Sequence, residues 1–428
     1  MQNKKLILLG LNELNLEYVE NYISKGHLPN FKHLFENYGY KQTTSEAEYH
    51  LLEPWIQWVT LHTGKTYEEH RVFRLGDIVD RKDIYQLWEI AEEKGLTVGA
   101  VSPFNTDNRL KNAKFFVPDP WTKTRAAGDA FVKQVSAAVS QAVNDNAKGG
   151  LNKASIMALL KTYLKVVPVS KYNEYLSLVA GIKSKVGTKA VILDKLLGDL
   201  FMSQWKKHKP DFSSLFLNTG AHFQHHYMFN SIAYNGEFEN PEWYCPNNQD
   251  PLFEILNEYD KLLGRLLKTG ARLLVATGLH QKPHKHLTYY WRLKEHDEFL
   301  RLAGISNYQE VIPRMSRDFL VNFDDTVKAK EVEEKLSLFK AIHDGENIFT
   351  IDNRGKSLFV ELTYPKNIPD NFDIQGDRII ENFGKYVAFV AIKNGEHDGV
   401  GYFIDTQENE LPETFELARV FDHIISSF

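Results

Sequence analysis

The chain has 428 residues, of which 43% are hydrophobic and 25% charged, and its formal net charge is −5 at pH 7. This is the composition of an ordinary globular protein with a large core. The acidic balance provides no overall attraction to nucleic acid, so we expect no nucleic-acid partner. The single cysteine, Cys245, excludes an intrachain disulfide and favours a reducing compartment, so we expect a cytoplasmic location.

The first predicted element is a buried strand at Leu6–Leu11. A short apolar run that ends in polar residues is typical of a parallel strand whose carboxyl end carries function. Asn12 and Glu13 interrupt the apolar run too early for a signal peptide. No segment of the chain is long and apolar enough to cross a bilayer, so we expect no transmembrane segment.

Helical and strand patterns then alternate along the chain. Residues 16–39 have helical spacing, and Pro54 opens a further expected helix that ends near Gly64. Residues 97–102 form the next predicted strand. This alternation predicts an α/β fold, with a mainly parallel sheet sandwiched by helices.

Residues 119–210 have a different character, with helical periodicity and few strand signals. We interpret them as a helical insertion in an α/β core formed by residues 1–118 and 211–428. The second half of the insertion carries many lysines, opposed by only a few acidic residues. This pattern favours solvated amphipathic helices. The alternative is a basic cap that faces a phosphorylated substrate or makes peripheral contact with a membrane surface.

Strand patterns resume after the insertion, at residues 213–218, 271–277, 357–362, 386–392 and 399–404. Polar residues lie directly beside several of these strands. Because the carboxyl ends of parallel strands meet at one crevice, we expect these side chains to converge there. The expected set comprises Asn12, Glu13, Glu53, Thr219, His222, His225, His226, His280, His397 and Asp398.

The histidines among them predict a metal site. His222 and His226 are four residues apart, which places both rings on one face of a helix. His397 and His280 would complete the site from neighbouring strand ends. Imidazole ligands suit zinc, with manganese or iron as the alternatives. The competing interpretation is that these are ordinary polar residues at strand ends.

One further candidate for substrate binding is Arg292, in the segment YYWRLK. Its planar guanidinium group is suited to clamp a phosphate or a carboxylate. The alternative is a surface salt bridge. His284 and His286, just before it, are expected to be solvated on a loop.

The order of the motifs resembles the alkaline phosphatase superfamily, in particular its type I phosphodiesterase and nucleotide pyrophosphatase branch. The segments that carry the resemblance are LILLGLNELN, GHLPNFKHLFENYG, WVTLHTGKTYEEH, LFLNTGAHFQHH, LLVATGLHQ and EHDGVGYFI, which lie in this order between residues 6 and 404. The resemblance implies an alkaline phosphatase-like core and divalent metal ions that hold a phosphate group. It also implies a small-molecule or sugar-linked phosphate as substrate.

Several positions depart from the pattern of that superfamily. The first metal-binding Asp falls on Asn12, and the nucleophilic Thr or Ser falls on Pro54, which has no hydroxyl. The Asp of an Asp-x-x-x-His motif falls on His222, whereas His226 and His397 keep their places. The superfamily's Asp-His pair falls on Gly278 and Leu279 or, shifted by one, on Leu279 and His280. These changes remove the covalent nucleophile and weaken a second metal site. A single-metal site at His222, His226 and His397 is the remaining interpretation.

The expected catalytic residues are therefore Glu53 and Glu13, one of which would act as base for a water that attacks directly. Glu53 precedes the helix at Pro54, and the helix dipole would keep it ionised. The alternative is that Glu53 only caps this helix.

Three functions fit the sequence. The first is a metal-dependent hydrolase or transferase that acts on a phosphate ester, a phosphodiester or a related anion. The second is a transferase in surface-polysaccharide modification. The third is a degenerate, non-catalytic binding protein on the same scaffold.

Overall fold

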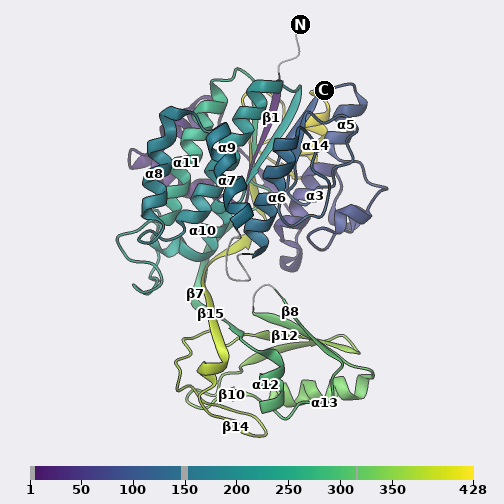
Figure 1. Cartoon of the computed structure of the whole chain (residues 1–428), viewed down its shortest axis with the longest axis vertical. Coiled ribbons are helices and arrows are strands. Elements are labelled where there is room, and N and C mark those ends of the chain that lie inside the picture. The colour runs from purple at the N-terminus through teal and green to yellow at the C-terminus, as the bar shows by residue number, and fades with distance from the viewer. Residues whose placement is uncertain (1–4, 146–152, 315–316) are drawn as a thin grey trace. The chain divides into compact units, whose positions relative to one another are not determined.

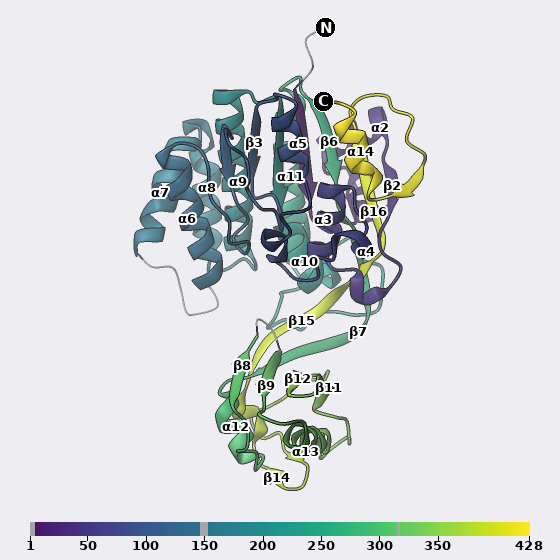
Figure 2. The same cartoon turned by 90° about the vertical axis from the view of Figure 1, so that its right-hand side faces the viewer.

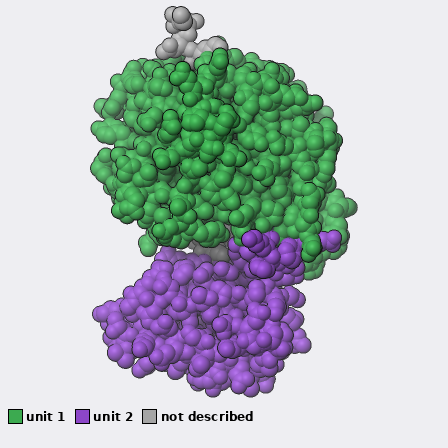
Figure 3. Space-filling model, turned by 180° about the vertical axis from the view of Figure 1, so that it is seen from behind, with its two compact units in different colours: residues 1–237, 241–283, 395–428 green, residues 238–240, 284–394 purple. Residues whose placement is uncertain are grey.

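The computed structural model describes residues 5–145, 153–314 and 317–428. The chain forms two compact units, coloured separately in Figure 3. Unit 1 comprises Met1–Glu237, Pro241–Pro283 and Gly395–Phe428, and unit 2 comprises Phe238–Asn240 and His284–Asn394. The sequence-based boundaries group the chain differently, because they separate residues 119–210 from the core and leave residues 284–394 inside it.

Unit 1 contains an eight-stranded sheet in the order β17-β2-β16-β6-β1-β5-β3-β4. The strands β6, β1, β5, β3 and β4 are mutually parallel, whereas β16 runs antiparallel to β6 and to β2. The predicted α/β fold with a mainly parallel sheet is therefore confirmed. The bounds of the strands are Leu6–Leu11 (β1), Lys41–Thr44 (β2), Val98–Val101 (β3), Phe115–Val117 (β4), Phe212–Leu217 (β5), Arg272–Ala276 (β6), Val400–Asp405 (β16) and Thr414–Glu416 (β17).

Helices cover both faces of this sheet. Successive side chains of its central strand β1 point to opposite faces, and both faces are apolar. Ile7 and Leu9 enter one hydrophobic cluster, and Leu6 and Leu8 enter another. Figure 1 shows α9 and α11 on one side of β1 and α3 and α14 on the other. The α-helices of unit 1 outside residues 119–210 are α1 (Leu16–Ser24), α2 (Pro29–Tyr38), α3 (Pro54–Thr63), α4 (Tyr67–His70), α5 (Leu87–Glu93), α10 (Thr219–Tyr227), α11 (Pro251–Leu267) and α14 (Arg419–Ile425).

The helix after Pro54 illustrates how local sequence sets these boundaries. Proline at the first helical position costs no hydrogen bond, and α3 begins there. The helix ends at Gly64, which adopts a left-handed conformation (φ 67°) and donates its N–H to the carbonyl oxygen of Thr60. Both predicted boundaries of this helix are confirmed.

The described part of residues 119–210 contains four α-helices: α6 (Ala130–Asp145), α7 (Lys153–Val166), α8 (Tyr172–Gly181) and α9 (Thr188–His208). Figure 2 shows them on one flank of unit 1. Leu200 and Phe201 of α9 are fully buried in the same cluster as the central strand β1. The segment therefore contributes to the core of unit 1. None of the helices in the described ranges combines the length and the hydropathy that a membrane span needs.

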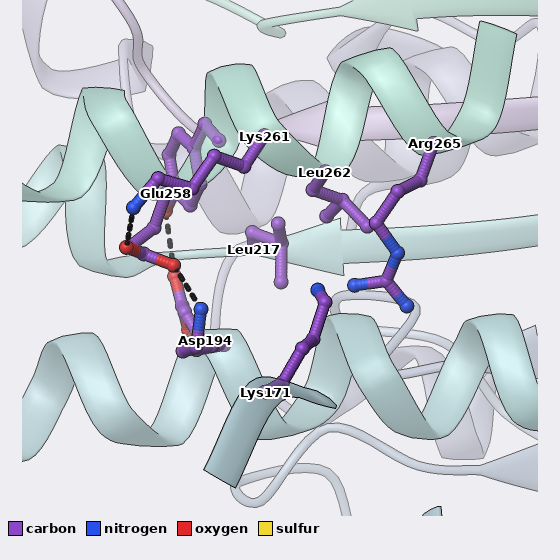
Figure 4. A pocket seen from close by; sticks show the side chains of 9 residues that line it. Lys171, Asp194, Leu217, Glu258, Lys261, Leu262 and Arg265 are labelled. Carbon is purple, nitrogen blue, oxygen red and sulfur yellow. Dashed lines mark hydrogen bonds and ion pairs between the residues drawn. The ribbon is translucent and has the colours of Figure 1, made fainter. Parts of the chain in front are cut away.

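A network of buried charges lies among α8, α9 and α11. Asp199 accepts a hydrogen bond from the Tyr175 hydroxyl (2.8 Å), pairs with Arg265, and lies 3.5 Å from the Lys171 ammonium. Lys195 pairs with Glu174 and Glu258. Figure 4 shows the small cavity between these helices, with the Lys171 and Arg265 side chains lining it.

Unit 2 has its own hydrophobic cluster and a four-stranded antiparallel sheet in the order β11-β12-β9-β8. Two long strands, β7 (His280–Leu293) and β15 (Val387–Asp398), pair with each other and connect the two units. The remaining elements are β8 (Glu310–Pro313), β9 (Asp318–Asn322), β10 (Lys340–Ala341), β11 (Phe349–Asn353), β12 (Ser357–Leu362), β13 (Ile374–Gln375), β14 (Ile379–Ile380), α12 (His296–Leu302) and α13 (Thr326–Ser337). The predicted strand at residues 357–362 is thus confirmed as β12, but it belongs to the antiparallel sheet of unit 2 and not to the eight-stranded sheet of unit 1.

Candidate metal centre

The centre is built around Glu13, the second residue after β1, which ends at Leu11 and is followed by Asn12. Glu13 has a left-handed backbone conformation (φ 55°), which is unusual for a residue with a side chain. Its N–H donates to the Thr277 carbonyl oxygen (3.0 Å). Its own carbonyl oxygen accepts from the N–H of Gln281 (3.2 Å) and from Nε2 of Gln224 (2.7 Å). These contacts fix the backbone in the strained conformation that directs the carboxylate.

Two histidines from distant parts of the chain meet this carboxylate. Glu13 Oε2 lies 3.0 Å from Nε2 of His225 on α10 and 3.1 Å from Nε2 of His397 near the end of β15. The three ligand atoms all lie within 4.8 Å of one another. Within the part of the chain that the structure describes, this is the one group of three or more His, Cys, Asp or Glu side chains with such convergence.

Amide side chains hold the carboxylate in place. Asn12 Nδ2 donates to Glu13 Oε1 (2.9 Å), and Gln281 Nε2 donates to Glu13 Oε2 (2.5 Å). Asn12 is itself oriented, because its Oδ1 accepts from the Trp58 indole N–H (2.7 Å) and its Nδ2 also donates to Asn218 Oδ1 (2.7 Å). Such outer contacts are what orients the ligands of a metal.

The charge of this group favours an ionised Glu13. Burial would raise the pKa of its carboxyl, but the adjacent His397 and His225 imidazoles lower the pKa well below its usual range. Glu13 is therefore an anion that two ring nitrogens face. Glu13 Oε2, His225 Nε2 and His397 Nε2 are the atoms that a divalent cation would contact.

Glu53 lies on the far side of His397. Its Oε2 is 3.9 Å from His397 Nδ1, and about a third of its side chain is exposed (32%). Burial raises the pKa of Glu53 to about 7, although His397 lowers it, and Glu13 raises it further. The sequence-based expectation is that the α3 dipole keeps Glu53 ionised, whereas a pKa of about 7 leaves the carboxyl partly protonated at neutral pH. Glu53 occupies the position before the first turn of α3, but its side chain makes no capping hydrogen bond to that turn.

The other predicted histidines lie outside this group of three. His222 and His226 are neighbours on α10, with ring centroids 4.8 Å apart, and His222 is exposed. His280 Nδ1 is 2.6 Å from the Val400 carbonyl oxygen, and its ring packs on Tyr402. Of the four histidines expected as ligands, the structure brings only His397 to Glu13.

The predicted substrate-binding residues are also separated. Asn12 lies in the centre and positions Glu13. The N–H of Thr219 donates to Asp194 Oδ2 (2.8 Å), and its hydroxyl donates to the Ala190 carbonyl oxygen (3.1 Å), so Thr219 starts α10. Arg292 is an exposed residue of β7 within unit 2.

Sequence reasoning placed His225 among the strand-end residues but did not choose it as a ligand, and it missed Gln281 and Trp58. The signal for His225 was its place on α10 beside the buried residues Gln224 and Ala221, which mark the side of the helix that faces the core. The four-residue spacing of His222 and His226 drew attention to another side of the same helix.

Trp58 explains one departure from the superfamily pattern. A Cβ atom on Gly278 would lie 3.0 Å from the Trp58 indole nitrogen, and Gly278 has a left-handed conformation (φ 76°). A carboxylate side chain at position 278 therefore has no room. The indole fills this space and donates to Asn12, where the superfamily pattern has metal-binding Asp residues.

One carboxylate oxygen and two imidazole nitrogens form a donor set that suits zinc, iron or manganese. The residues present thus fit a single divalent cation. They do not provide the carboxylates for a second one at the positions of Asn12 and Gly278.

Comparisons with known proteins were made for the family, the sequence and the fold. No protein-family profile and no curated protein sequence matches the chain. Among solved structures, phosphonoacetate hydrolase from Sinorhizobium meliloti 1021 is similar over 99% of this chain and 96% of that one, with a TM-score of 0.45 and 11% identity. Human ectonucleotide pyrophosphatase/phosphodiesterase 5 has the same TM-score and identity over 99% and 95%. The alkaline phosphatase of the Antarctic bacterium TAB5 has a TM-score of 0.41 and 11% identity over 100% and 98%.

The chain is similar to members of the alkaline phosphatase superfamily. At 11% identity the likeness concerns the fold and not the chemistry of the site.

Proposed function

We propose that the protein is a metal-dependent hydrolase of a phosphate ester or phosphodiester, with one divalent cation at Glu13, His225 and His397. The observation that carries the proposal is the convergence of these three ligand atoms within 4.8 Å. Zinc is the first candidate for the cation, and manganese and iron are the alternatives.

The chain's own residues have separate tasks in this proposal. His225 and His397 would hold the cation as neutral imidazoles, together with the Glu13 carboxylate. Asn12 and Gln281 keep the carboxylate in the ligating orientation by hydrogen bonds. The cation, when bound, supplies Lewis-acid stabilisation to the phosphoryl oxygens.

Glu53 is the proposed general base. Its pKa of about 7 leaves a substantial fraction ionised at neutral pH, where a base is most effective. It would take a proton at a carboxylate oxygen from the water that attacks phosphorus. Because Pro54 provides no hydroxyl, direct attack by water is favoured over a covalent phosphoenzyme.

The metal site is tested by the metal content of the purified protein, with two matched variants. His225→Ala is expected to lose the cation, whereas His226→Ala, one residue further on the same helix, is expected to keep about one per chain. Loss in His226→Ala and retention in His225→Ala would move the site to the other side of α10. A wild-type protein that binds no cation after incubation with zinc, manganese or iron contradicts the proposal.

The reaction is tested with 4-nitrophenyl phosphate and bis(4-nitrophenyl) phosphate. Glu53→Gln is expected to lower kcat by about 10²–10⁴-fold while the metal content stays the same. In ¹⁸O-labelled water the label should enter the phosphate product during a single turnover. Metal binding without any turnover on phosphate esters would favour a binding protein, and transfer to an added sugar in place of water would favour a transferase.

A further inference from the structure

The helices that precede α9 expose large apolar side chains to solvent. Each of these residues is 47% to 78% exposed. They come from α7, from the turn after it and from α8, and we call them the exposed apolar face: Met157, Leu160, Leu164, Val169, Leu176 and Val179. Met157, Leu160 and Leu164 are spaced by three and four residues, so they lie on one side of α7 and form an apolar stripe. Contiguous exposed apolar surface of this kind marks sites of interaction.

The fold of unit 1 does not require this face. On α7, Thr162 and Val166 are the buried residues, and Tyr163 packs on Tyr172 and Tyr175 (ring centroids 4.9 and 5.1 Å). Leu160 and Leu164 point to another side of the helix. α7 therefore uses one side to pack and has a second, apolar side that contributes nothing to the core.

The charges around this face are strongly positive, although the whole chain is acidic. Residues 153–189 contain a single acidic residue, Glu174, which pairs with the buried Lys195. The same segment contains seven lysines at 153, 161, 165, 171, 183, 185 and 189, of which Lys171 pairs with Asp199 and Lys185 with Glu254. Lys161, Lys183 and Lys189 are exposed and make no ion pair with any residue that the structure describes.

A second copy of the chain is a poor occupant for such a face. Lysine is depleted in the centres of protein–protein interfaces, and two copies would bring like charges together. An anionic lipid surface matches both features, because lysines bind lipid phosphates while neighbouring apolar side chains enter the acyl boundary.

We propose that the exposed apolar face and its lysines dock the protein on an anionic lipid surface. This inference is independent of the proposed hydrolase function. It also explains why the segment is rich in lysine although the substrate site lies elsewhere in unit 1.

The test is co-sedimentation of the full chain with vesicles of phosphatidylcholine alone or mixed with phosphatidylglycerol. Wild type is expected to bind the anionic vesicles and not the neutral ones, and binding should weaken as the salt rises from about 0.05 M to about 0.5 M. Met157→Gln, Leu160→Gln and Leu164→Gln together should lower the partition coefficient by about tenfold or more. Lys161→Glu, Lys183→Glu and Lys189→Glu together should abolish the preference for anionic lipid.

A matched control replaces three equally exposed apolar residues of unit 2, Val327, Leu338 and Ile379, with glutamine. This variant should bind vesicles as wild type does. Metal content and circular dichroism should be unchanged in all variants, so that misfolding is recognised. Absence of vesicle binding overturns the proposal, as does equal loss in the control variant or full binding by the apolar triple variant. A wild-type dimer in light scattering that the apolar triple variant dissociates would assign the face to a second copy instead.

Discussion

Unit 1 holds two buried groups of charged side chains that differ in the kind of base that meets the carboxylate. In the network around Asp199, the partners are the Arg265 guanidinium and the Lys171 ammonium, which donate hydrogen bonds and have no lone pair to give. At Glu13 the partners are the imidazoles of His225 and His397, which can lose their protons. The guanidinium and ammonium groups offer no ligand atom beside the carboxylate, whereas the two imidazoles complete the donor set of the proposed metal site.

Replacing Glu13 with glutamine should have the largest effect on function. Glutamine keeps the volume but removes the anionic ligand. Because loss of an outer partner of a ligand already costs about 10–100-fold in affinity or activity, loss of the ligand itself should exceed that range. Metal content and turnover, measured on the same preparation, check this. Glu17→Gln, at an exposed position on α1, is the control, and wild-type metal content in Glu13→Gln would contradict the comparison.

Replacing Asp199 with asparagine should reduce stability and leave the metal site intact. The variant leaves Arg265 and Lys171 without their carboxylate, and removing one partner of a buried pair costs about 3–5 kcal/mol. The free energy of unfolding from denaturant titration measures the loss. Glu254→Gln removes an exposed partner of Lys185 and should change stability by less than about 1 kcal/mol. A fall in metal content without a fall in stability would mean that the two groups are not distinct.

Local sequence was sufficient to predict the strands β1, β5 and β6 and the helix from Pro54 to Gly64. The strand-end rule also placed Glu13, Glu53 and His397 near one another, and His397 contacts both carboxylates. The antiparallel sheet of unit 2 was not predicted, because a buried apolar strand does not reveal which sheet it joins.

The choice among the three histidines of α10 could not be made from spacing. The rotation of α10 is set by contacts from other helices: Asp194 accepts from the Thr219 N–H, and the Tyr259 hydroxyl accepts from the Gly220 N–H (3.0 Å). These partners lie 25 and 39 residues away in the chain. Periodicity shows that a helix has faces, but only such tertiary contacts decide that His225 is the one that meets Glu13.

A smaller effect is expected at Gln281, which touches the metal centre without being a ligand. Gln281→Met keeps the length of the side chain but removes the N–H that donates to Glu13 Oε2. The dissociation constant of the cation should rise about 10–100-fold, measured by competition with a chelating dye. Gln57 of α3 has an equally buried amide, which donates to the Leu51 carbonyl oxygen. Gln57→Met removes this donor and should leave the dissociation constant of the cation unchanged. An equal change in both variants would point to general loosening of the fold.

The smallest effect concerns a buried imidazole that has neither a carboxylate nor a cation beside it. His62 packs between the rings of Trp88 and Trp58 (centroids 4.6 and 5.6 Å), and burial lowers its pKa to about 3. In the unfolded chain the ordinary pKa is about 6.5, so below that pH the unfolded state binds a proton that the folded state does not. The stabilisation by neutral His62 is therefore complete above about pH 6.5 and declines as the pH falls toward 3.

The loss amounts to about 1.4 kcal/mol at pH 5.5 relative to pH 7.5. His62→Gln cannot titrate, so the free energy of unfolding of this variant should fall less over that interval, by about this amount, whatever its stability at pH 7.5. His50→Gln, at an exposed position, should keep the wild-type pH dependence. Equal slopes in His62→Gln and wild type would mean that His62 finds a proton acceptor in the folded protein. Burial alone would then no longer decide the protonation state of His62.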